Sequence, residues 1–442
     1  MRLKVVIVGA GLGGLTCAIA LARKGHQVTL LEASEILGEV GAGIQIPPNS
    51  ACVLQYLGLH EKFLDVIYWP KAIHLRRYAN GATIGTTPLN PFLTEKYGAP
   101  YWVIHRADYH RLLHNAAVEN GVDIHIASRV VDCDEKTATV TCSDGNTYSG
   151  DLIVAADGIR SIVRSKIFPE LTDEFVSSGT SAFRATVDTK LMESDPELKQ
   201  LIDSPNTNCW IGPGGHVMSY LIRDKTLYNL VMIHPGDCEP GIWNMPGDVK
   251  DILAEYRGWD PKLVKLLGLI SNSLKWRVCY LKELPTWISK SSTVALLGDA
   301  AHAMVPFLAQ GAAQAIEDGV TLTECVSRAN SAADLPSLLK LYETIRKPRT
   351  TRVQLGSIKY GDVWHLEDGP EQVSRDQQML IECQKLEDEA IDIHPLVGDP
   401  KAEIPGYDLN NPNYWSDDKF QPWLFGHNAL KTAEYYLNQA GW

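Results

Sequence analysis

Three glycines and one acidic residue near the N-terminus have the types and the spacing of a dinucleotide-binding turn. Gly9, Gly11 and Gly14 fit the pattern GxGxxG, which follows an apolar run and opens a stretch of helical character. The first glycine permits a tight turn, the second lets the backbone approach a pyrophosphate, and the third allows close packing of helix on strand. Glu32 ends the next apolar run, where its carboxylate can accept hydrogen bonds from ribose hydroxyls. The array predicts that the chain binds an ADP moiety. The motif alone does not separate NAD from FAD, and a glycine-rich turn without a ligand is the alternative.

Three later segments repeat the arrangement of a glycine or an acidic residue near an apolar run. They are Glu39–Ile46, which contains Gly41 and Gly43, then Asp157-Gly158, and Gly298–His302, which is followed by Pro306 and by Gln310–Ala313 at the start of a predicted helix. Asp299 could also serve only as a cap for the helix that follows it.

The elements that must position these residues have two kinds of pattern. Four runs are almost entirely apolar and predict buried parallel strands: Leu3–Val8, Gln27–Glu32, Leu152–Ala156 and Thr293–Leu297. Four others alternate and predict an antiparallel sheet: Ser177–Val187, Thr207–Ile211, His216–Ile222 and Leu227–Ile233. We therefore expect an α/β protein in which a nucleotide-binding domain with a parallel sheet is interrupted by a mainly antiparallel second domain of the α+β kind.

The helical segments are less regular. Val249–Ile270 is predicted to be mainly helical, and Leu335–Leu355 is predicted to be one long helix. Beyond about Trp364 the chain is acidic and contains several prolines, so we expect an extension packed on the body, with one last helix after Asn428.

Together the three spaced segments resemble the single-component FAD-dependent aromatic hydroxylases, the group A flavoprotein monooxygenases. The nearest subgroup is the salicylate-hydroxylase-like one, including its fungal relatives, and the resemblance runs from residue 1 to about 360. It implies the fold of p-hydroxybenzoate hydroxylase, with a Rossmann-like FAD-binding domain. On this basis residues 1–72, 101–175 and 282–362 are predicted to form that domain, residues 73–100 and 176–281 the substrate domain, and residues 363–442 a C-terminal extension.

The resemblance also implies roles for single residues around non-covalently bound FAD. Asp299 would bind a ribityl hydroxyl, Pro306 would lie beside the isoalloxazine ring, and Arg106 would contact the flavin, with Arg111 the weaker candidate. The backbone of Val130 would lie near the adenine, and Asp157 matches a segment linked to both FAD and the nicotinamide cofactor. The amides at the start of the later helix would face the flavin N1/O2 edge; these are Gly311, Ala312 and Ala313.

Three residues of the antiparallel domain are the candidates for contact with substrate. His216 and Tyr220 lie four residues apart on one predicted strand and hence on one face of it. Arg184 lies on another strand and is permanently cationic. Tyr220 could instead belong to the core, and Arg184 could belong to a structural ion pair.

The activity that the resemblance implies is hydroxylation of a small aromatic substrate. NADPH or NADH would reduce the flavin, and O2 would then give a flavin C4a-hydroperoxide that attacks a phenol activated as its phenolate. Salicylate or another hydroxybenzoate is the first expectation, and dearomatising hydroxylation or epoxidation in natural-product biosynthesis is the alternative. From other classes, an NAD-dependent dehydrogenase or a flavin-binding protein without hydroxylase activity also fits the first motif.

The composition argues against other partners. Lys and Arg total 41 against 53 Asp and Glu, a net charge of −12, which disfavours nucleic acid and anionic membranes as partners. The nine cysteines have no paired spacing, so we expect reduced thiols in a cytoplasmic protein. We also expect the protein to be a monomer or a homodimer. His110 and His114 lack the glutamate of HExxH, and no metal site is expected. The uncharged run Val5–Ala22 contains four glycines, which suits a turn better than a membrane span.

Overall fold

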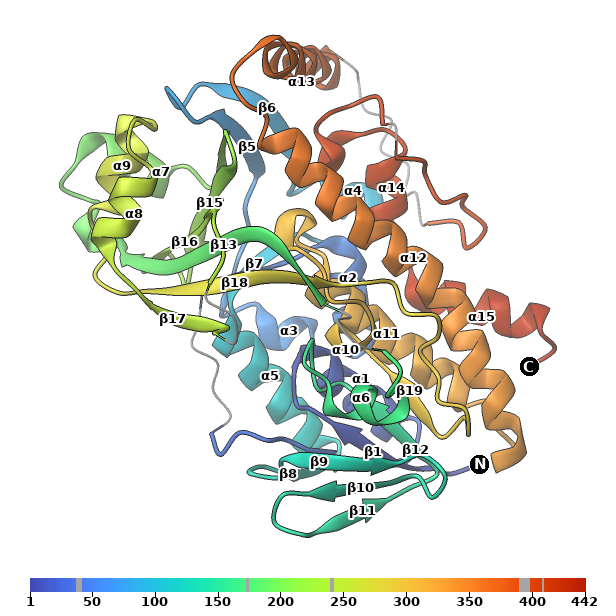
Figure 1. The fold of residues 1–442 in the computed structure, drawn as a ribbon. Helices are drawn as coiled ribbons and strands as arrows, with labels where there is room; N and C mark the ends of the chain where they lie inside the picture. Colours follow the sequence, from blue (N-terminus) through green and yellow to red (C-terminus); the bar gives the residue numbers. More distant parts are fainter. Residues whose placement is uncertain (37–41, 172–174, 239–241, 389–397, 408) are drawn as a thin grey trace.

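A five-stranded parallel sheet collects strands that are far apart in the sequence (Figure 1). The computed structural model describes residues 1–36, 42–171, 175–238, 242–388, 398–407 and 409–442. The strand order is β19 (Val294–Leu296), β12 (Leu152–Ala155), β1 (Lys4–Val8), β2 (Gln27–Leu31) and β8 (Asp123–His125), and all neighbours are parallel. The four predicted parallel strands are thus confirmed, and the chain between β12 and β19 builds a separate sheet.

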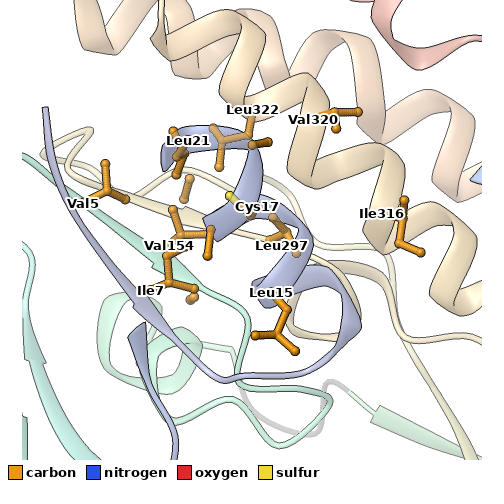
Figure 2. Close-up of a cluster of buried hydrophobic side chains, with 14 of the residues drawn as sticks. Val5, Ile7, Leu15, Cys17, Leu21, Val154, Leu297, Ile316, Val320 and Leu322 are labelled. Atoms are coloured by element: carbon orange, nitrogen blue, oxygen red, sulfur yellow. The ribbon is translucent and has the colours of Figure 1, made fainter. Parts of the chain in front are cut away.

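Two helices pack closely over this sheet. α1 (Leu12–Arg23) directly follows the glycine-rich turn, and α11 (Gly311–Val326) lies against it. The contact is close because Gly319 has no side chain: a Cβ atom there would lie 2.9 Å from the backbone nitrogen of Cys17. Figure 2 shows the apolar cluster that these helices form with the strands, in which Leu15, Val154 and Ile316 are buried. The helix N-termini are thereby held at the same side of the sheet.

The second sheet has eight strands and is antiparallel except where β14 runs parallel to β5. This confirms the predicted mainly antiparallel domain. Its order is β17 (Asn244–Gly247), β18 (Ser273–Leu281), β13 (Phe175–Asp188), β16 (Leu227–Pro235), β15 (Gly215–Ile222), β14 (Thr207–Gly212), β5 (Ala72–Arg77) and β6 (Thr83–Pro88). The strands β5 and β6 join it from a separate, earlier part of the chain, and the predicted domain assignment stays a prediction.

Smaller sheets and short helices complete this part of the fold. Two three-stranded sheets comprise β3 (Gly43–Ile46), β7 (Trp102–His105) and β4 (Ile67–Tyr68), and β11 (Thr147–Ser149), β10 (Thr139–Cys142) and β9 (Val130–Asp134). The shorter helices of this part are α2 (Pro48–Tyr56), α3 (His60–Phe63), α4 (Phe92–Tyr97), α5 (Arg106–Glu119), α6 (Ile162–Ile167) and α7 (Pro196–Asp203).

One predicted helical segment is mainly helical as expected but is broken, and one predicted helix is longer than expected. The segment Val249–Ile270 is broken into α8 (Val249–Glu255) and α9 (Pro261–Leu267), because Asp260 caps a new helix whose first residue is a proline. The long helix does not end at Leu355 but continues as α12 (Leu335–Trp364). Its last turns are stabilised by tertiary packing, because Tyr360 and Trp364 are buried there, and not by local helix propensity.

The C-terminal extension holds more structure than the single predicted helix. α15 (Ala429–Gln439) is that helix, but α13 (Pro370–Asp388), α14 (Phe420–Phe425) and a single 3-10 turn at Tyr414–Ser416 precede it. α13 packs along β6 at the edge of the large sheet, where the Thr86 amide donates to Cys383 Sγ at 2.9 Å (Figure 1). Among the described residues, no helix combines the length and the apolar character needed to cross a bilayer.

Candidate active site

A cavity of about 340 Å³ lies where the two sheets meet. Its walls come from the starts of α1 and α11, from β3, from the turn after β19, and from the face of the large sheet. Eight of the predicted cofactor residues border it: Gly11, Gly14, Gly43, Arg106, Asp299, Pro306, Gly311 and Ala312. All three predicted substrate residues border it as well: Arg184, His216 and Tyr220.

The glycines of the first turn have different reasons to be glycine. A Cβ atom at Gly9 would lie 2.3 Å from the carbonyl oxygen of Ala156, and one at Gly14 would lie 2.1 Å from the carbonyl oxygen of Gly9. Neither contact is sterically possible, so both glycines are needed for the fold. At Gly11 a Cβ atom would meet nothing within 4 Å and would project into open space. This open space beside the start of α1 is therefore available to a ligand.

The turn is held from two sides. The Ala10 amide donates to Glu32 Oε2 at 2.9 Å, while the Ser34 amide donates to Oε1 at 2.8 Å. His110 Nε2 donates to the Ala10 carbonyl at 2.7 Å, which gives this histidine a structural contact. Glu32 therefore does not line the cavity itself but fixes the backbone that does.

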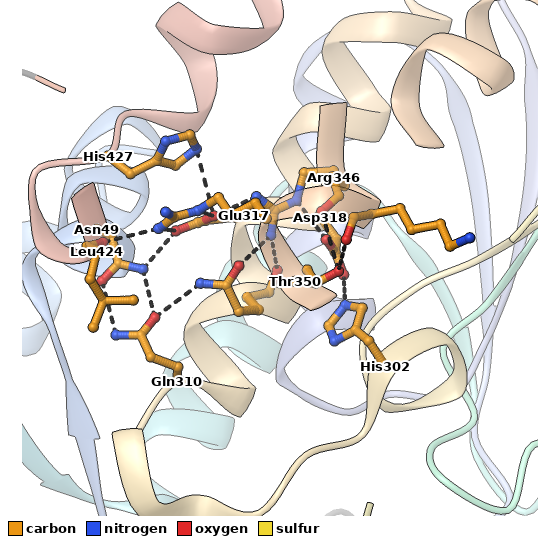
Figure 3. A network of polar contacts seen from close by, with 12 residues as sticks. Asn49, His302, Gln310, Glu317, Asp318, Arg346, Thr350, Leu424 and His427 are labelled. Atoms are coloured by element: carbon orange, nitrogen blue, oxygen red, sulfur yellow. Dashed lines mark hydrogen bonds and ion pairs between the residues drawn. The ribbon is translucent and has the colours of Figure 1, made fainter. Parts of the chain in front are cut away.

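The turn that carries Asp299 and the start of α11 are joined to a buried ionic cluster (Figure 3). Asp318 accepts from the Gly298 amide at 3.0 Å, from His302 Nε2 at 2.6 Å and from Arg346 Nε at 2.7 Å. The turn before Asp299 thus has a fixed position behind the cavity wall.

The same cluster orients Gln310, which directly precedes α11 and borders the cavity. Asn49 Nδ2 donates to Gln310 Oε1 at 3.0 Å and to Glu317 Oε1 at 2.6 Å. Arg349 Nε lies 2.9 Å from Glu317 Oε2. Burial by itself raises the pKa of Glu317, but the two guanidiniums of Arg349 and Arg346 outweigh it and lower the pKa. The carboxylate of Glu317 is therefore charged. Its contact with Asn49 fixes the position of Gln310 at the cavity.

Two arginines bring positive charge to the cavity. Burial and, to a smaller extent, the charge of Arg184 lower the pKa of Arg106 while Asp299 opposes them, and the net pKa is about 10. Burial also lowers the pKa of Arg184. Both groups remain cationic at neutral pH, which makes this part of the wall suited to an anion.

The floor of the cavity is a row of side chains on the large sheet. Met218 of β15 lies opposite Val231 of β16, which in turn lies opposite Arg184 of β13. His216 and Tyr220 flank Met218 on β15, as the predicted spacing requires. Gly43 packs on this floor, since its amide donates to Asn229 Oδ1 at 2.6 Å and a Cβ atom there would lie 2.5 Å from the Tyr220 ring.

Other predicted cofactor residues do not reach the cavity with their side chains. The carboxylate of Asp157 accepts from Ser161 Oγ at 2.5 Å and from the Val163 amide at 3.1 Å, which fixes the start of α6. Val130 is buried in β9, and Ala313 is buried one residue inside α11. The predicted contribution of Gly41 lies outside the described residues.

Several cavity residues were not predicted. Gln45, Met218, Met304, Phe307, Trp364 and Trp415 all border it. The alternation on β15 could have indicated Met218, because it lies between two predicted site residues. Nothing local indicates Trp415, which is far from every motif in the sequence.

Comparison with known proteins agrees with this geometry. A family model described as an FAD binding domain matches residues 2–356. The chain is 31% identical over 434 residues to the FAD-dependent monooxygenase OpS4 of Beauveria bassiana, covering 98% of this chain and 96% of the relative. It is also 34% identical over 391 residues to 3-amino-4-hydroxybenzoate 2-monooxygenase PtmB3 of Streptomyces platensis, covering 88% and 95%. The chain belongs to the FAD-dependent monooxygenases.

Solved structures give the same fold to this monooxygenase. A salicylate hydroxylase in complex with its substrate aligns with a TM-score of 0.74 and 25% identity, covering 89% of this chain and 96% of that one. CtdE in complex with FAD and a substrate aligns with a TM-score of 0.80 at 20% identity, covering 99% and 98%. The predicted fold, that of p-hydroxybenzoate hydroxylase, is confirmed.

The cofactor of the monooxygenase is FAD, and the cavity fits it. The open space at Gly11 adjoins the start of α1, and Gly311 opens α11; no side chain caps either helix. Both helix starts border the cavity, so their backbone amides and positive dipole ends are available to the pyrophosphate and to the flavin N1/O2 edge. The NAD-dependent dehydrogenase that the first motif left open is excluded by the family.

Proposed function

We propose that this monooxygenase hydroxylates a phenolic substrate of the hydroxybenzoate type, with NADH or NADPH as reductant and O2 as co-substrate. The relatives named for 3-amino-4-hydroxybenzoate and 3-hydroxybenzoate support a phenolic acid as the substrate class. When bound and reduced, FAD supplies the oxygen-transfer chemistry, so the task of the chain is to bind and orient the phenol and exclude water.

The observation that carries this proposal is the environment of the Arg184 side chain. Its side chain borders the cavity, while its buried Nε has no hydrogen-bond partner among the described residues. Within the described chain no carboxylate lies within ion-pair distance of it, which argues against the structural ion pair that the sequence left open. The ring centroid of Trp276 lies 5.9 Å from the guanidinium carbon of Arg184. An unsatisfied buried donor is costly, and an anionic oxygen of the substrate would satisfy it.

Tyr220 and His216 complete the proposed contacts. Burial raises the pKa of Tyr220, so its hydroxyl stays protonated and can donate to the same phenolate oxygen. Burial lowers the pKa of His216 well below its usual value, so its imidazole is neutral. A neutral imidazole can contact the part of the substrate farther from Arg184 without adding a second charge to the cavity.

Substitution of Arg184 and Tyr220 tests the proposal. Arg184→Met and Tyr220→Phe should leave the visible spectrum of bound FAD unchanged. They should lower kcat/KM for a phenolic substrate by about 10²–10⁴-fold, and the pH optimum should rise as phenolate stabilisation is lost. Arg223→Met is the matched control, because Arg223 follows β15 but pairs with Asp108 at 2.9 Å outside the cavity.

The readouts are NAD(P)H oxidation and the mass of the product. If both variants turn over at the rate of the control, the substrate site is not on this face of the sheet. If phenols of this class give only hydrogen peroxide and no hydroxylated product, the proposed reaction is wrong.

A further inference from the structure

One end of the cavity is built by residues that lie beyond the FAD-binding motifs. Trp364 ends α12, and Trp415 lies in the 3-10 turn of the C-terminal extension. Both border the cavity, together with Phe307 and His216. The ring centroid of His216 lies 5.2 Å from the ring centroid of Phe307 and 4.8 Å from that of Trp364. We call these four residues the aromatic end of the cavity.

The aromatic end is separate from the cationic group proposed to bind the substrate oxygen. Each residue of a strand advances the chain by about 3.3 Å, so His216 and Tyr220, four residues apart, lie about 13 Å apart along β15. The charge of Arg184 shifts the pKa of Tyr220 and the pKa of Arg106. The pKa of His216 is instead shifted by its ionisable neighbour His365. A single benzoate ring held by Arg184 and Tyr220 is shorter than this distance and leaves the aromatic end uncovered.

Trp415 is held rigidly at this end. It is 1% exposed, and its ring lies 5.4 Å from Trp364 and 5.4 Å from Tyr360, edge-on to both. The Tyr360 hydroxyl donates to Asn413 Oδ1 at 2.9 Å, while Gln421 Nε2 donates to the Trp415 carbonyl at 2.5 Å. A ring fixed on several sides presents a defined surface to a ligand instead of adapting to it.

The extension around Trp415 is also tied to the large sheet and to α11. Asn413 Nδ2 donates to Thr87 Oγ1 of β6 at 2.9 Å. Arg349, which pairs with Glu317 of α11, donates to the carbonyls of Trp423 and Leu424 at 2.9 and 3.0 Å (Figure 3). The position of Trp415 is therefore fixed relative to the helix whose start borders the cofactor part of the cavity.

We propose that Trp415 is a specificity-determining residue that contacts an apolar, flat part of the substrate remote from its phenolate or carboxylate oxygen. The substrate class is accordingly a phenol or phenolic acid that carries a second ring or a comparable apolar group. This inference rests on the proposed function, because it takes the oxygen-binding group to be Arg184. Two large rings and an imidazole edge offer both area and favourable ring geometry to such a group.

The test compares salicylate with two ligands that add a phenyl ring to it, 4-phenylsalicylate and 5-phenylsalicylate. The two phenyl derivatives differ in the position at which the second ring is attached. Their dissociation constants are measured by calorimetry on the FAD-loaded enzyme. We expect the better phenylsalicylate to bind the wild-type enzyme about 10-fold more tightly than salicylate, which corresponds to about 1.4 kcal/mol. In Trp415→Ala this preference should fall to about 2-fold, with salicylate affinity and FAD content unchanged.

Two further variants keep the experiment decisive. Trp415→Phe retains an aromatic wall and should keep most of the preference, even if the alanine variant does not fold. Trp423→Phe is the control, since Trp423 belongs to the same extension and stacks on Arg349 at 4.7 Å without bordering the cavity.

The outcomes separate the two proposals. A phenyl preference that is absent in the wild type, or the same in Trp415→Ala as in the control, overturns the role of Trp415 while leaving the proposed function intact. If none of the three ligands binds the wild type or stimulates NAD(P)H oxidation, the proposed function fails and the inference fails with it.

Discussion

Nδ1 of His216 lies 2.8 Å from Nε2 of His365. The rings are inclined by only 24°, and the contact joins the floor of the cavity to the residue that follows α12. His216 is buried and His365 is half-buried. Burial lowers the pKa of both rings, and burial together with the charge of Arg375 brings the pKa of His365 to about 4. The pair is therefore neutral at physiological pH, and one ring donates to the other.

The neutral pair predicts a loss of stability in mild acid. An unfolded histidine takes up a proton near pH 6.5, whereas in the folded chain these two do so only at much lower pH. Their contribution is fully present above about pH 7 and is lost as the pH falls from there toward about 4. Each histidine contributes a slope of about 1.4 kcal/mol per pH unit in this window. Urea unfolding at pH 7.5 and pH 5.0 measures the effect, and His365→Gln should have the shallower dependence. Equal dependence in the two proteins contradicts the buried neutral pair.

The Glu317 cluster predicts a large cost for removing one charge. Glu317→Gln leaves the buried guanidinium of Arg349 without Glu317 and leaves Arg346 with Asp318 alone, and we expect a loss of about 3–5 kcal/mol in the free energy of unfolding. Asp203→Asn is the control, because the pair Lys199–Asp203 is exposed on α7 and should contribute less than about 1 kcal/mol. Chemical denaturation compares the two variants. A Glu317→Gln variant as stable as the Asp203→Asn variant means that the cluster relaxes without cost.

Alanine substitutions at two glycines should separate cofactor binding from folding. Gly11→Ala adds a methyl group in open space beside the start of α1, so the protein should fold normally and lose most of its FAD. Gly14→Ala places the same methyl group 2.1 Å from the Gly9 carbonyl, so the fold itself should be destabilised. Thermal unfolding of the FAD-free proteins and fluorescence titration with FAD measure the two effects. The reverse pattern would contradict the proposed position of the pyrophosphate.

Glu32 offers a milder test of the same site. Glu32→Ala removes the acceptor of the Ala10 and Ser34 amides as well as the group expected to bind a ribose hydroxyl. FAD affinity should fall by about 1–3 kcal/mol. Glu32→Gln keeps an acceptor for one amide and should lose less. Titration of the apoprotein with FAD decides the point, and an unchanged dissociation constant in Glu32→Ala argues against any role in binding.

Local patterns in the sequence were sufficient for the parts of the site that are built by continuous segments. The turn at Gly9–Gly14 could be predicted because it directly follows an apolar strand, and the start of α11 because Gln310–Ala313 opens a stretch of helical character. The shared face of His216 and Tyr220 followed from the two-residue period of a strand. The meeting of these segments around one cavity needed the family resemblance, since no local pattern pairs β1 with β12 or places β5 beside β14.

The remaining residues could not be predicted because their positions depend on packing at a distance. Asp157 follows a buried strand as an acidic cofactor contact would, but its carboxylate is used by the start of α6. Trp415 has no motif, and its place in the cavity wall depends on contacts with Tyr360 and Gln421. The C-terminal turns of α12 and the helices α13 and α14 were missed for the same reason, because burial maintains them against weak local preference.

The position of α13 has a consequence for the behaviour of shortened chains. β6 is the last strand of the large sheet, and a bare edge strand offers unpaired backbone groups to another molecule. α13 covers this edge, and Cys383 engages the Thr86 amide directly. A chain cut before residue 370 would expose a ready template for strand addition, so it should self-associate in addition to losing Trp415 from the cavity wall.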